Sequence, residues 1–226
     1  MIVTIDGPAG AGKSTVARGL AQRLGYLFLD TGAMYRAVTY ATLRAGADFT
    51  QVAERIAVAN KTWIDLQEDV ILVDGEDVSQ LIRTTEVTEN VHFMADDPSI
   101  RELLVERQRA MASGQNVVTE GRDQGTVVFP EAACKIFLTA SPEERARRRH
   151  AEREHAGEAV TLDEIRASQD LRDGRDASRP VGTLRKALDA VEVVTDGMTA
   201  AEVVAHLETL VRKKSTKQVL YSRDAS

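Results

Sequence analysis

Short apolar runs rich in β-branched residues alternate along the chain with longer stretches of helical periodicity. The apolar runs lie at residues 2–5, 27–29, 117–119, 135–138 and 191–195. Runs of this length are typical of buried strands, and a helical stretch between consecutive strands is typical of parallel pairing. The pattern therefore predicts an α/β fold in which helices cover a parallel central sheet.

Three helices are predicted to begin at capping boxes, in which a Ser or Thr precedes a Glu by three residues. The pairs are Ser141 with Glu144, Thr161 with Glu164, and Thr199 with Glu202. In the first pair, Pro142 at the first helical position supports the same boundary.

The periodicity changes between residues 63 and 73. Two β-like runs, 63–66 and 70–73, are followed there by an Asp74-Gly75 turn. This combination predicts a small inserted hairpin. Residues 213–226 are polar and weakly patterned after the last helix, which predicts a mobile tail.

Composition narrows the classes of function. The chain has 226 residues, enough for one α/β domain, which we expect at residues 1–212. Its net charge of −6 gives no basic excess, so nucleic acid is not an expected partner. The single cysteine, Cys134, cannot form an internal disulfide and is expected in the core. No stretch approaches bilayer length and Asp6 follows only a few apolar residues, so we expect no membrane contact and a cytoplasmic location.

The strongest chemical signal follows the first predicted strand and opens the first predicted helix. It is a P-loop, formed by Gly7, Pro8, Ala9, Gly10, Ala11, Gly12, Lys13, Ser14 and Thr15. Its glycines let backbone N–H groups converge on phosphate oxygens at a helix N-terminus. Lys13 is expected to reach the β and γ phosphates of ATP, and the Ser14 hydroxyl to face Mg²⁺.

Other segments decide among the classes of P-loop protein. A switch GTPase needs an Asn-Lys-x-Asp segment, whereas Asn60-Lys61 is followed by Thr62 and Trp63. Instead, residues 30–36 and 120–125 follow predicted strands and each contains an arginine. Open α/β sheets bind ligands at the carboxyl ends of their strands, so these segments are candidates for binding an acceptor.

Several blocks of the chain together resemble the bacterial cytidylate kinases, which phosphorylate CMP and dCMP. The blocks are residues 5–8, 30–36, 75–78, 82–87, 121–130 and 172–179, within a resemblance that spans residues 2–211. The resemblance implies a three-layer P-loop kinase with an acceptor-side insert, expected at 61–92, and an arginine-rich lid, expected at 145–182. Five arginines begin the lid, namely Arg145, Arg147, Arg148, Arg149 and Arg153, of which Arg148 is expected to contact ATP.

The resemblance also implies roles for single residues. It assigns Arg36, Arg122 and Arg179 to the CMP phosphate, where with Lys13 they would form the catalytic set. It assigns Arg172 and Asp176 to the ribose, and Arg101 and Asp123 to the cytosine. Thr31, Tyr35 and His92 complete the expected substrate-binding residues. No general base is required, because the attacking oxygen belongs to an ionised phosphate.

Three positions depart from the family pattern. His92 stands where relatives carry a small hydroxyl residue, and its role stays open. Ser14 replaces a common glycine, which favours a direct contact with Mg²⁺. Pro180 changes the expected hinge of the lid.

Two alternatives to a (d)CMP kinase stay open. One is a kinase for UMP, AMP or dTMP, and the other is a nucleotide-binding module without turnover. We expect a monomer, because no long heptad pattern stands out.

Overall fold

The computed structural model describes residues 1–67, 70–155, 157–179 and 181–224. They form two compact units, one made of Met1–Phe28 and Gly114–Ser226 and the other of Leu29–Ser113. Within the described residues, no helix combines the length and the apolar character needed to cross a membrane.

A five-stranded sheet forms the centre of the first unit, and in it β1 pairs parallel with β6 and β7, and β7 pairs parallel with β8. Its order is β2-β6-β1-β7-β8, with β1 at Ile2–Asp6, β2 at Leu27–Asp30, β6 at Val117–Gly121, β7 at Cys134–Thr139 and β8 at Val191–Val194. All five strands lie at the apolar runs of the sequence. The predicted α/β fold with a parallel central sheet is confirmed.

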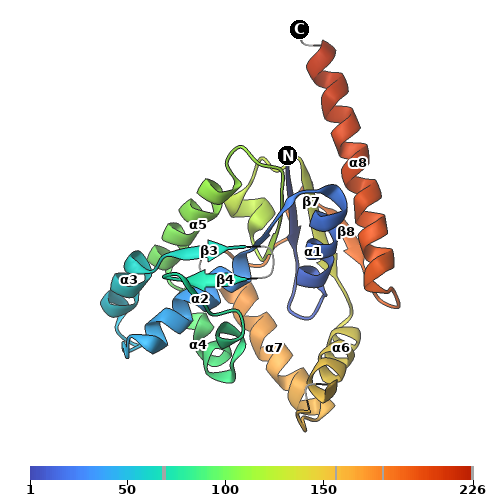
Figure 1. Ribbon diagram of the computed structural model, residues 1–226. Coiled ribbons are helices and arrows are strands. Elements are labelled where there is room, and N and C mark those ends of the chain that lie inside the picture. The colour runs from blue at the N-terminus through green and yellow to red at the C-terminus, as the bar shows by residue number, and fades with distance from the viewer. Residues whose placement is uncertain (68–69, 156, 180, 225–226) are drawn as a thin grey trace. The chain divides into compact units, whose positions relative to one another are not determined.

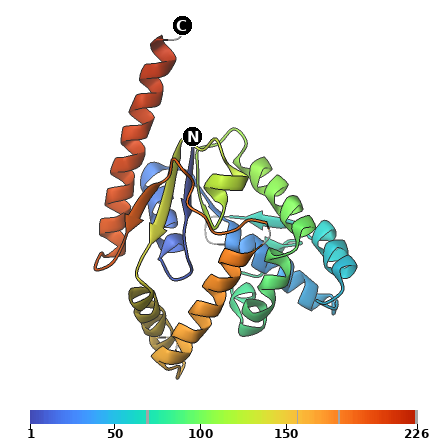
Figure 2. The same cartoon turned by 180° about the vertical axis from the view of Figure 1, so that it is seen from behind.

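Helices α1 (Lys13–Leu24) and α8 (Ala200–Asp224) pack on this sheet (Figure 1). Apolar side chains of both helices join those of β1, β6, β7 and β8 in one buried cluster, which includes Cys134. Helices α6 (Pro142–His155) and α7 (Leu162–Ser178) lie side by side beyond the end of the sheet (Figures 1 and 2). They occupy the predicted lid region, whose Pro180 lies outside the described residues.

Two of the three predicted capping boxes are confirmed. Thr161 with Glu164 and Thr199 with Glu202 each exchange both hydrogen bonds. The third, Ser141 with Glu144, is only half formed: the Ser141 hydroxyl caps the Glu144 N–H, but the Glu144 carboxylate binds two arginines instead. Asp196 accepts the Ser141 N–H in its place.

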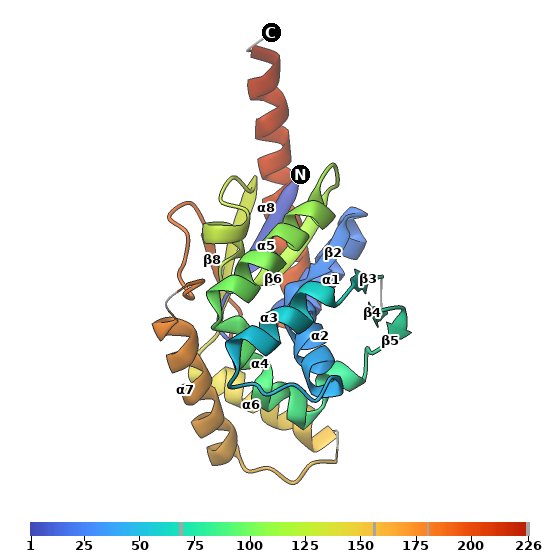
Figure 3. The same ribbon diagram turned by 90° about the vertical axis from the view of Figure 1, so that its left-hand side faces the viewer.

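The second unit is mainly helical (Figure 3). Its helices are α2 (Thr31–Arg44), α3 (Val52–Lys61), the short η1 (Leu81–Arg83), α4 (Thr85–Ala95) and α5 (Pro98–Ala112). Met34, Ile82, Met94 and Leu104 are among its fully buried side chains. The core of this unit is therefore built from four different helices.

The predicted hairpin lies in the second unit. Strands β3 (Ile64–Leu66) and β4 (Ile71–Val73) pair antiparallel, and a third strand, β5 (Glu76–Asp77), pairs with β4. Asp74 and Gly75 both have positive φ, 54° and 85°, as the tight turn requires. The hairpin prediction is confirmed, and residues 68–69 of its connection lie outside the described residues.

The C-terminal segment is helical as far as Asp224, since α8 runs through most of residues 213–226. The last two residues of the chain lie outside the described ones. The mobility of this segment stays a prediction, because a helix can be rigid or mobile.

Candidate functional site

The P-loop connects β1 to α1, and its glycines leave room for phosphates because they carry no side chains. A Cβ atom at Gly7 would lie 1.9 Å from the carbonyl oxygen of Leu138 at the end of β7, so only glycine fits. Gly10 and Gly12 adopt the left-handed conformation, with φ of 78° and 82°. The loop therefore delivers the N-terminus of α1, with its backbone N–H groups and positive dipole end, to the edge of the sheet.

Lys13 is the first residue of α1 and is 5% exposed. Its Nζ donates a hydrogen bond to the Pro8 carbonyl oxygen at 2.9 Å, which holds the ammonium group inside the loop. Burial, with the positive charges of Arg122 and Arg172, lowers the pKa of Lys13 to about 7, although the carboxylates of Glu120 and Asp176 oppose the shift. An anion at this position would balance that excess of positive charge.

Ser14 donates a hydrogen bond from its hydroxyl to Glu120 Oε1 at 2.9 Å. Glu120 is buried near the end of β6, whose register places it opposite Ile5 of β1. The Ser14 hydroxyl and the Glu120 carboxylate are therefore in direct contact at the carboxyl edge of the sheet. Glu120 was not among the site residues predicted from the sequence, although its position at the end of a parallel strand was a usable signal.

Asp176 of α7 joins two of the arginines expected to bind the acceptor phosphate. Arg122 Nε lies 2.6 Å from Asp176 Oδ2, and Arg179 Nη2 lies 2.9 Å from Asp176 Oδ1. Burial by itself would raise the pKa of Asp176, but Arg122 and Arg179 outweigh it and hold the pKa below its ordinary value. Both arginines are therefore fixed by one ionised carboxylate.

Arg172 lies one turn before Asp176 on α7 and is exposed. Its charge contributes to the lowered pKa values of both Lys13 and Asp176, so it belongs to the same charged cluster. Within the first unit, Lys13, Arg122, Arg172, Asp176 and Arg179 are brought together as the sequence analysis expected. The role of Asp176 toward the ribose stays a prediction, since its carboxylate pairs here with Arg122 and Arg179.

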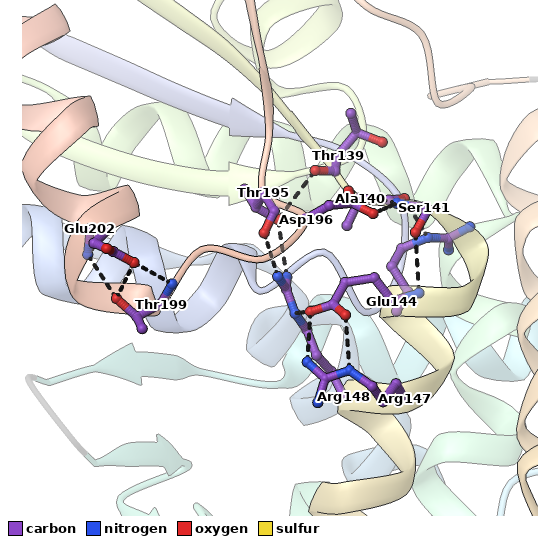
Figure 4. A network of polar contacts seen from close by, with 11 residues as sticks. Thr139, Ala140, Ser141, Glu144, Arg147, Arg148, Thr195, Asp196, Thr199 and Glu202 are labelled. Atoms are coloured by element: carbon purple, nitrogen blue, oxygen red, sulfur yellow. Dashed lines mark hydrogen bonds and ion pairs between the residues drawn. The ribbon is translucent and has the colours of Figure 1, made fainter.

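Arg148 reaches from α6 toward the connection between β8 and α8 (Figure 4). It donates hydrogen bonds to the Thr195 hydroxyl at 3.0 Å, to the Thr195 carbonyl oxygen at 2.6 Å and to Glu144 at 2.8 Å. A Cβ atom at Gly12 would lie 3.9 Å from Arg148 Nη1, so this arginine borders the P-loop. Its expected contact with ATP stays a prediction.

Arg145 differs from the other four arginines that begin the lid because it is buried. Its guanidinium donates to the carbonyl oxygen of Ala9 in the P-loop at 2.9 Å and pairs with Asp173 of α7 at 2.7 Å. Arg147 and Arg149 instead form exposed ion pairs along α6. The predicted arginine run thus contains a buried arginine, Arg145, beside exposed ones such as Arg147 and Arg149. Sequence spacing alone did not distinguish them.

Asp123 comes directly after Arg122, at the start of the π-helix η2 (Gln124–Val128), and is buried. Its carbonyl oxygen accepts the N–H groups of Val127 at 2.8 Å and Val128 at 3.2 Å. These bonds fix the backbone that carries the carboxylate.

In the second unit, Arg36 is held against α4. Its Nη1 donates to the Thr88 hydroxyl at 2.9 Å and to the Ile82 carbonyl oxygen at 3.3 Å. Thr31, the buried first residue of α2, follows the capping residue Asp30, whose carboxylate accepts the Ala33 N–H. Residues of the Asp30 to Arg36 block are therefore placed by the first turns of α2.

Three helices of this unit, α2, α4 and α5, carry Tyr35, His92 and Arg101, which are expected to bind the substrate. The Arg101 guanidinium lies 5.7 Å from the centre of the Tyr35 ring, and its Nη1 donates to the Ala95 carbonyl oxygen. His92 stacks on Phe93 with ring centres 4.2 Å apart, and its Nδ1 lies 2.7 Å from the Glu89 carbonyl oxygen. That contact requires Nδ1 to carry the proton, so a neutral His92 ring has Nε2 as an acceptor.

The family model described as cytidylate kinase matches residues 3–213. The chain belongs to the cytidylate kinase family. A cytidylate kinase of Rhodopirellula baltica is 52% identical over 213 residues, covering 94% of this chain and 93% of that protein. One of Mycobacterium leprae is 49% identical over 219 residues, covering 95% and 97%.

A solved structure has a fold similar to that of this chain. An uncharacterized protein from Eubacterium ventriosum superposes with a TM-score of 0.53 at 12% identity, covering 94% of this chain and 98% of that one. At this identity the likeness concerns the fold alone.

Proposed function

We propose that this member of the cytidylate kinase family transfers the terminal phosphoryl group of ATP to CMP and dCMP, giving ADP and the diphosphates. The observation that carries the proposal is the cationic cluster at the P-loop, in which Asp176 holds Arg122 and Arg179 and the buried Lys13 carries its charge nearby. A module that only bound ATP would have no use for this second group of cations.

The chemistry asks for charge neutralisation and positioning. The attacking oxygen is that of an ionised monophosphate, so no side chain has to remove a proton. Lys13 stabilises negative charge on the transferring group, and Arg36, Arg122 and Arg179 hold the acceptor phosphate. Arginine suits this role because its planar guanidinium binds phosphate oxygens in pairs.

The base is read by polar groups that match cytosine. In our proposal the Asp123 carboxylate accepts from the exocyclic amino group, and Arg101 donates to the ring acceptors. Thr31, Tyr35 and His92 complete the substrate-binding residues, and Arg172 and Asp176 bind the ribose. The Arg101 guanidinium near Tyr35 and the fixed backbone of Asp123 support this assignment.

Mg²⁺ is part of the proposal, and the residues present fit it. Ser14 and Glu120 bring a hydroxyl oxygen and a carboxylate to one place beside the P-loop, and Mg²⁺ prefers oxygen ligands. These two residues would hold the ion, directly or through water. When bound with ATP, the ion supplies positive charge to the phosphate oxygens.

A panel of acceptors tests the proposal. ADP release is measured with ATP and CMP, dCMP, UMP, AMP or dTMP, each at the same concentration. We expect turnover with CMP and dCMP to exceed that with the other three by at least about tenfold. A preference for UMP, AMP or dTMP would reassign the acceptor, and no turnover with any of them would favour a binding module.

We also propose that the enzyme acts as a monomer in the cytoplasm, where ATP is available, without nucleic acid as a partner. Light scattering of the purified protein measures the mass directly. A mass near 24.7 kDa supports the monomer, and twice that value contradicts it.

A further inference from the structure

One carboxylate at the end of β1 holds the start of η2. Asp6 Oδ1 accepts the backbone N–H of Gln124 at 2.8 Å, and Asp6 Oδ2 accepts that of Gly125 at 2.7 Å. Asp6 is the last residue of β1 and directly precedes Gly7 of the P-loop. A single side chain therefore fixes the two peptide groups that follow Asp123.

The contact is buried and tight. Asp6 is 4% exposed. A Cβ atom at Gly125 would lie 2.9 Å from Thr4 Oγ1 and 3.3 Å from Asp6 Oδ2, so the backbone of η2 approaches β1 too closely for a larger residue. The start of η2 is thus held both by hydrogen bonds and by steric contact.

Asp123 is fixed from both sides as a result. Its carbonyl oxygen accepts N–H groups from η2, and the next two N–H groups donate to Asp6. The preceding residue, Arg122, is anchored through Asp176. The direction of the Asp123 side chain therefore depends on a backbone that Asp6 holds.

The arrangement requires a carboxylate, although a carboxylate is costly there. Burial raises the pKa of Asp6 to about 6, because desolvation outweighs the two backbone hydrogen bonds. An asparagine would avoid buried charge, but its side chain has one acceptor oxygen and would turn an N–H donor toward the second amide. Only a carboxylate accepts from both neighbouring amides.

We propose that Asp6 is a positioning residue for base recognition: by holding the Gln124 and Gly125 amides, its carboxylate aims Asp123 at the cytosine. This inference rests on the proposed function, in which Asp123 reads the cytosine amino group. Asp6 itself does not touch the nucleotide and acts through the backbone of η2.

The test is Asp6→Asn, which keeps the shape of the side chain and removes one of its two acceptors. We expect kcat/KM for CMP to fall by about tenfold and the ratio of CMP to UMP efficiency to fall with it, while KM for ATP stays within about threefold. Hydrogen exchange of the Gln124 and Gly125 amides, followed by NMR, should accelerate.

Two further variants make the test specific. Thr4→Ser changes the same strand but keeps the hydroxyl oxygen that faces Gly125, so both the substrate ratio and the amide exchange should stay close to parental values. Gly125→Ala disturbs the contact from the side of η2 and should reproduce the kinetic pattern of Asp6→Asn. The double variant should show less than the sum of the two effects, because both act on one contact.

Parental amide exchange and a parental substrate ratio in Asp6→Asn would overturn the inference, and so would equal losses with CMP and UMP in a folded variant. If Asp6→Asn does not fold, Gly125→Ala decides by the same readouts. A parent enzyme without preference for CMP would instead defeat the proposed function, and the amide exchange would still report whether Asp6 holds the segment.

Discussion

At the scale of single residues, the site contains charged side chains that are largely shielded from water. Lys13, Arg122 and Asp176 are all buried to a large degree, and each alters the pKa of its neighbours. Charges arranged in this way before a substrate arrives cost stability in the free protein and stabilise a bound anion without further rearrangement.

Lys13 should reveal that cost in the dependence of stability on pH. Its pKa is about 7 in the folded protein and 10.5 ordinarily. Between these values the unfolded chain binds a proton that the folded protein does not, so this residue's destabilisation is full below pH 7 and declines as the pH rises. Lys13→Met should therefore be more stable than the parent by on the order of a few kcal/mol at neutral pH, and by less at about pH 9.5.

Urea denaturation of nucleotide-free protein at the two pH values measures the difference. A gap between parent and variant that does not change with pH would show that the lysine charge is not the cause. The same variant should lose turnover by at least about a hundredfold, because it lacks the positive charge that we propose Lys13 brings to the transferring phosphoryl group.

Arg36 should act on the acceptor side only. Arg36→Ala is expected to raise KM for CMP and lower kcat, together costing about tenfold or more in kcat/KM, because a charged contact with the acceptor phosphate is lost. Titration with an ATP analogue should give the parental affinity. Weakened ATP binding would place Arg36 on the donor side and refute its assignment.

At the scale of elements, Arg145 ties α6 to both the P-loop and α7. Asp173→Ala would leave the buried guanidinium without its carboxylate, and should lower the free energy of unfolding by about 2 kcal/mol and raise KM for ATP several-fold. Thermal or urea unfolding with ATP kinetics measures both effects.

Arg149→Ala is the control. Arg149 lies on α6 like Arg145, but its ion pair with Glu152 is exposed. It should change the free energy of unfolding by less than about 0.5 kcal/mol. Equal effects of the two substitutions would contradict a special role for Arg145.

Features encoded by neighbouring residues could be predicted from the sequence. The P-loop between β1 and α1 and the Asp74-Gly75 turn depend on local backbone conformation, and both are in place. The other half of the capping box at Ser141 could not be predicted, because the Ser141 N–H is accepted by Asp196, 55 residues further along the chain, and not by Glu144. The contacts of Asp6, Glu120 and Arg145 could not be predicted for the same reason, because their partners are distant in sequence.

At the scale of the whole molecule, the candidate acceptor residues come from both compact units. Arg36 and Arg101 belong to the second unit, and Arg122, Asp123 and Asp176 to the first. Their common role is a prediction from the family resemblance. Substitutions in either unit should therefore alter use of the same nucleotide.

The central claim is that this enzyme selects CMP by reading its cytosine with Asp123. In our proposal, an ionised Asp123 attracts the amino group of cytosine and repels the carbonyl oxygen that uracil has at the same position. In Asp123→Asn the amide can accept from cytosine or, after rotation, donate to uracil, so the rejection of uracil by charge is lost.

The most direct measurement is kcat/KM for CMP and for UMP on the parent and on Asp123→Asn. The parent should strongly prefer CMP, and the variant should have a lower CMP efficiency and a CMP to UMP ratio reduced by about tenfold or more. An unchanged ratio, with both substrates losing efficiency equally, would contradict the claim and leave Asp123 as a structural support.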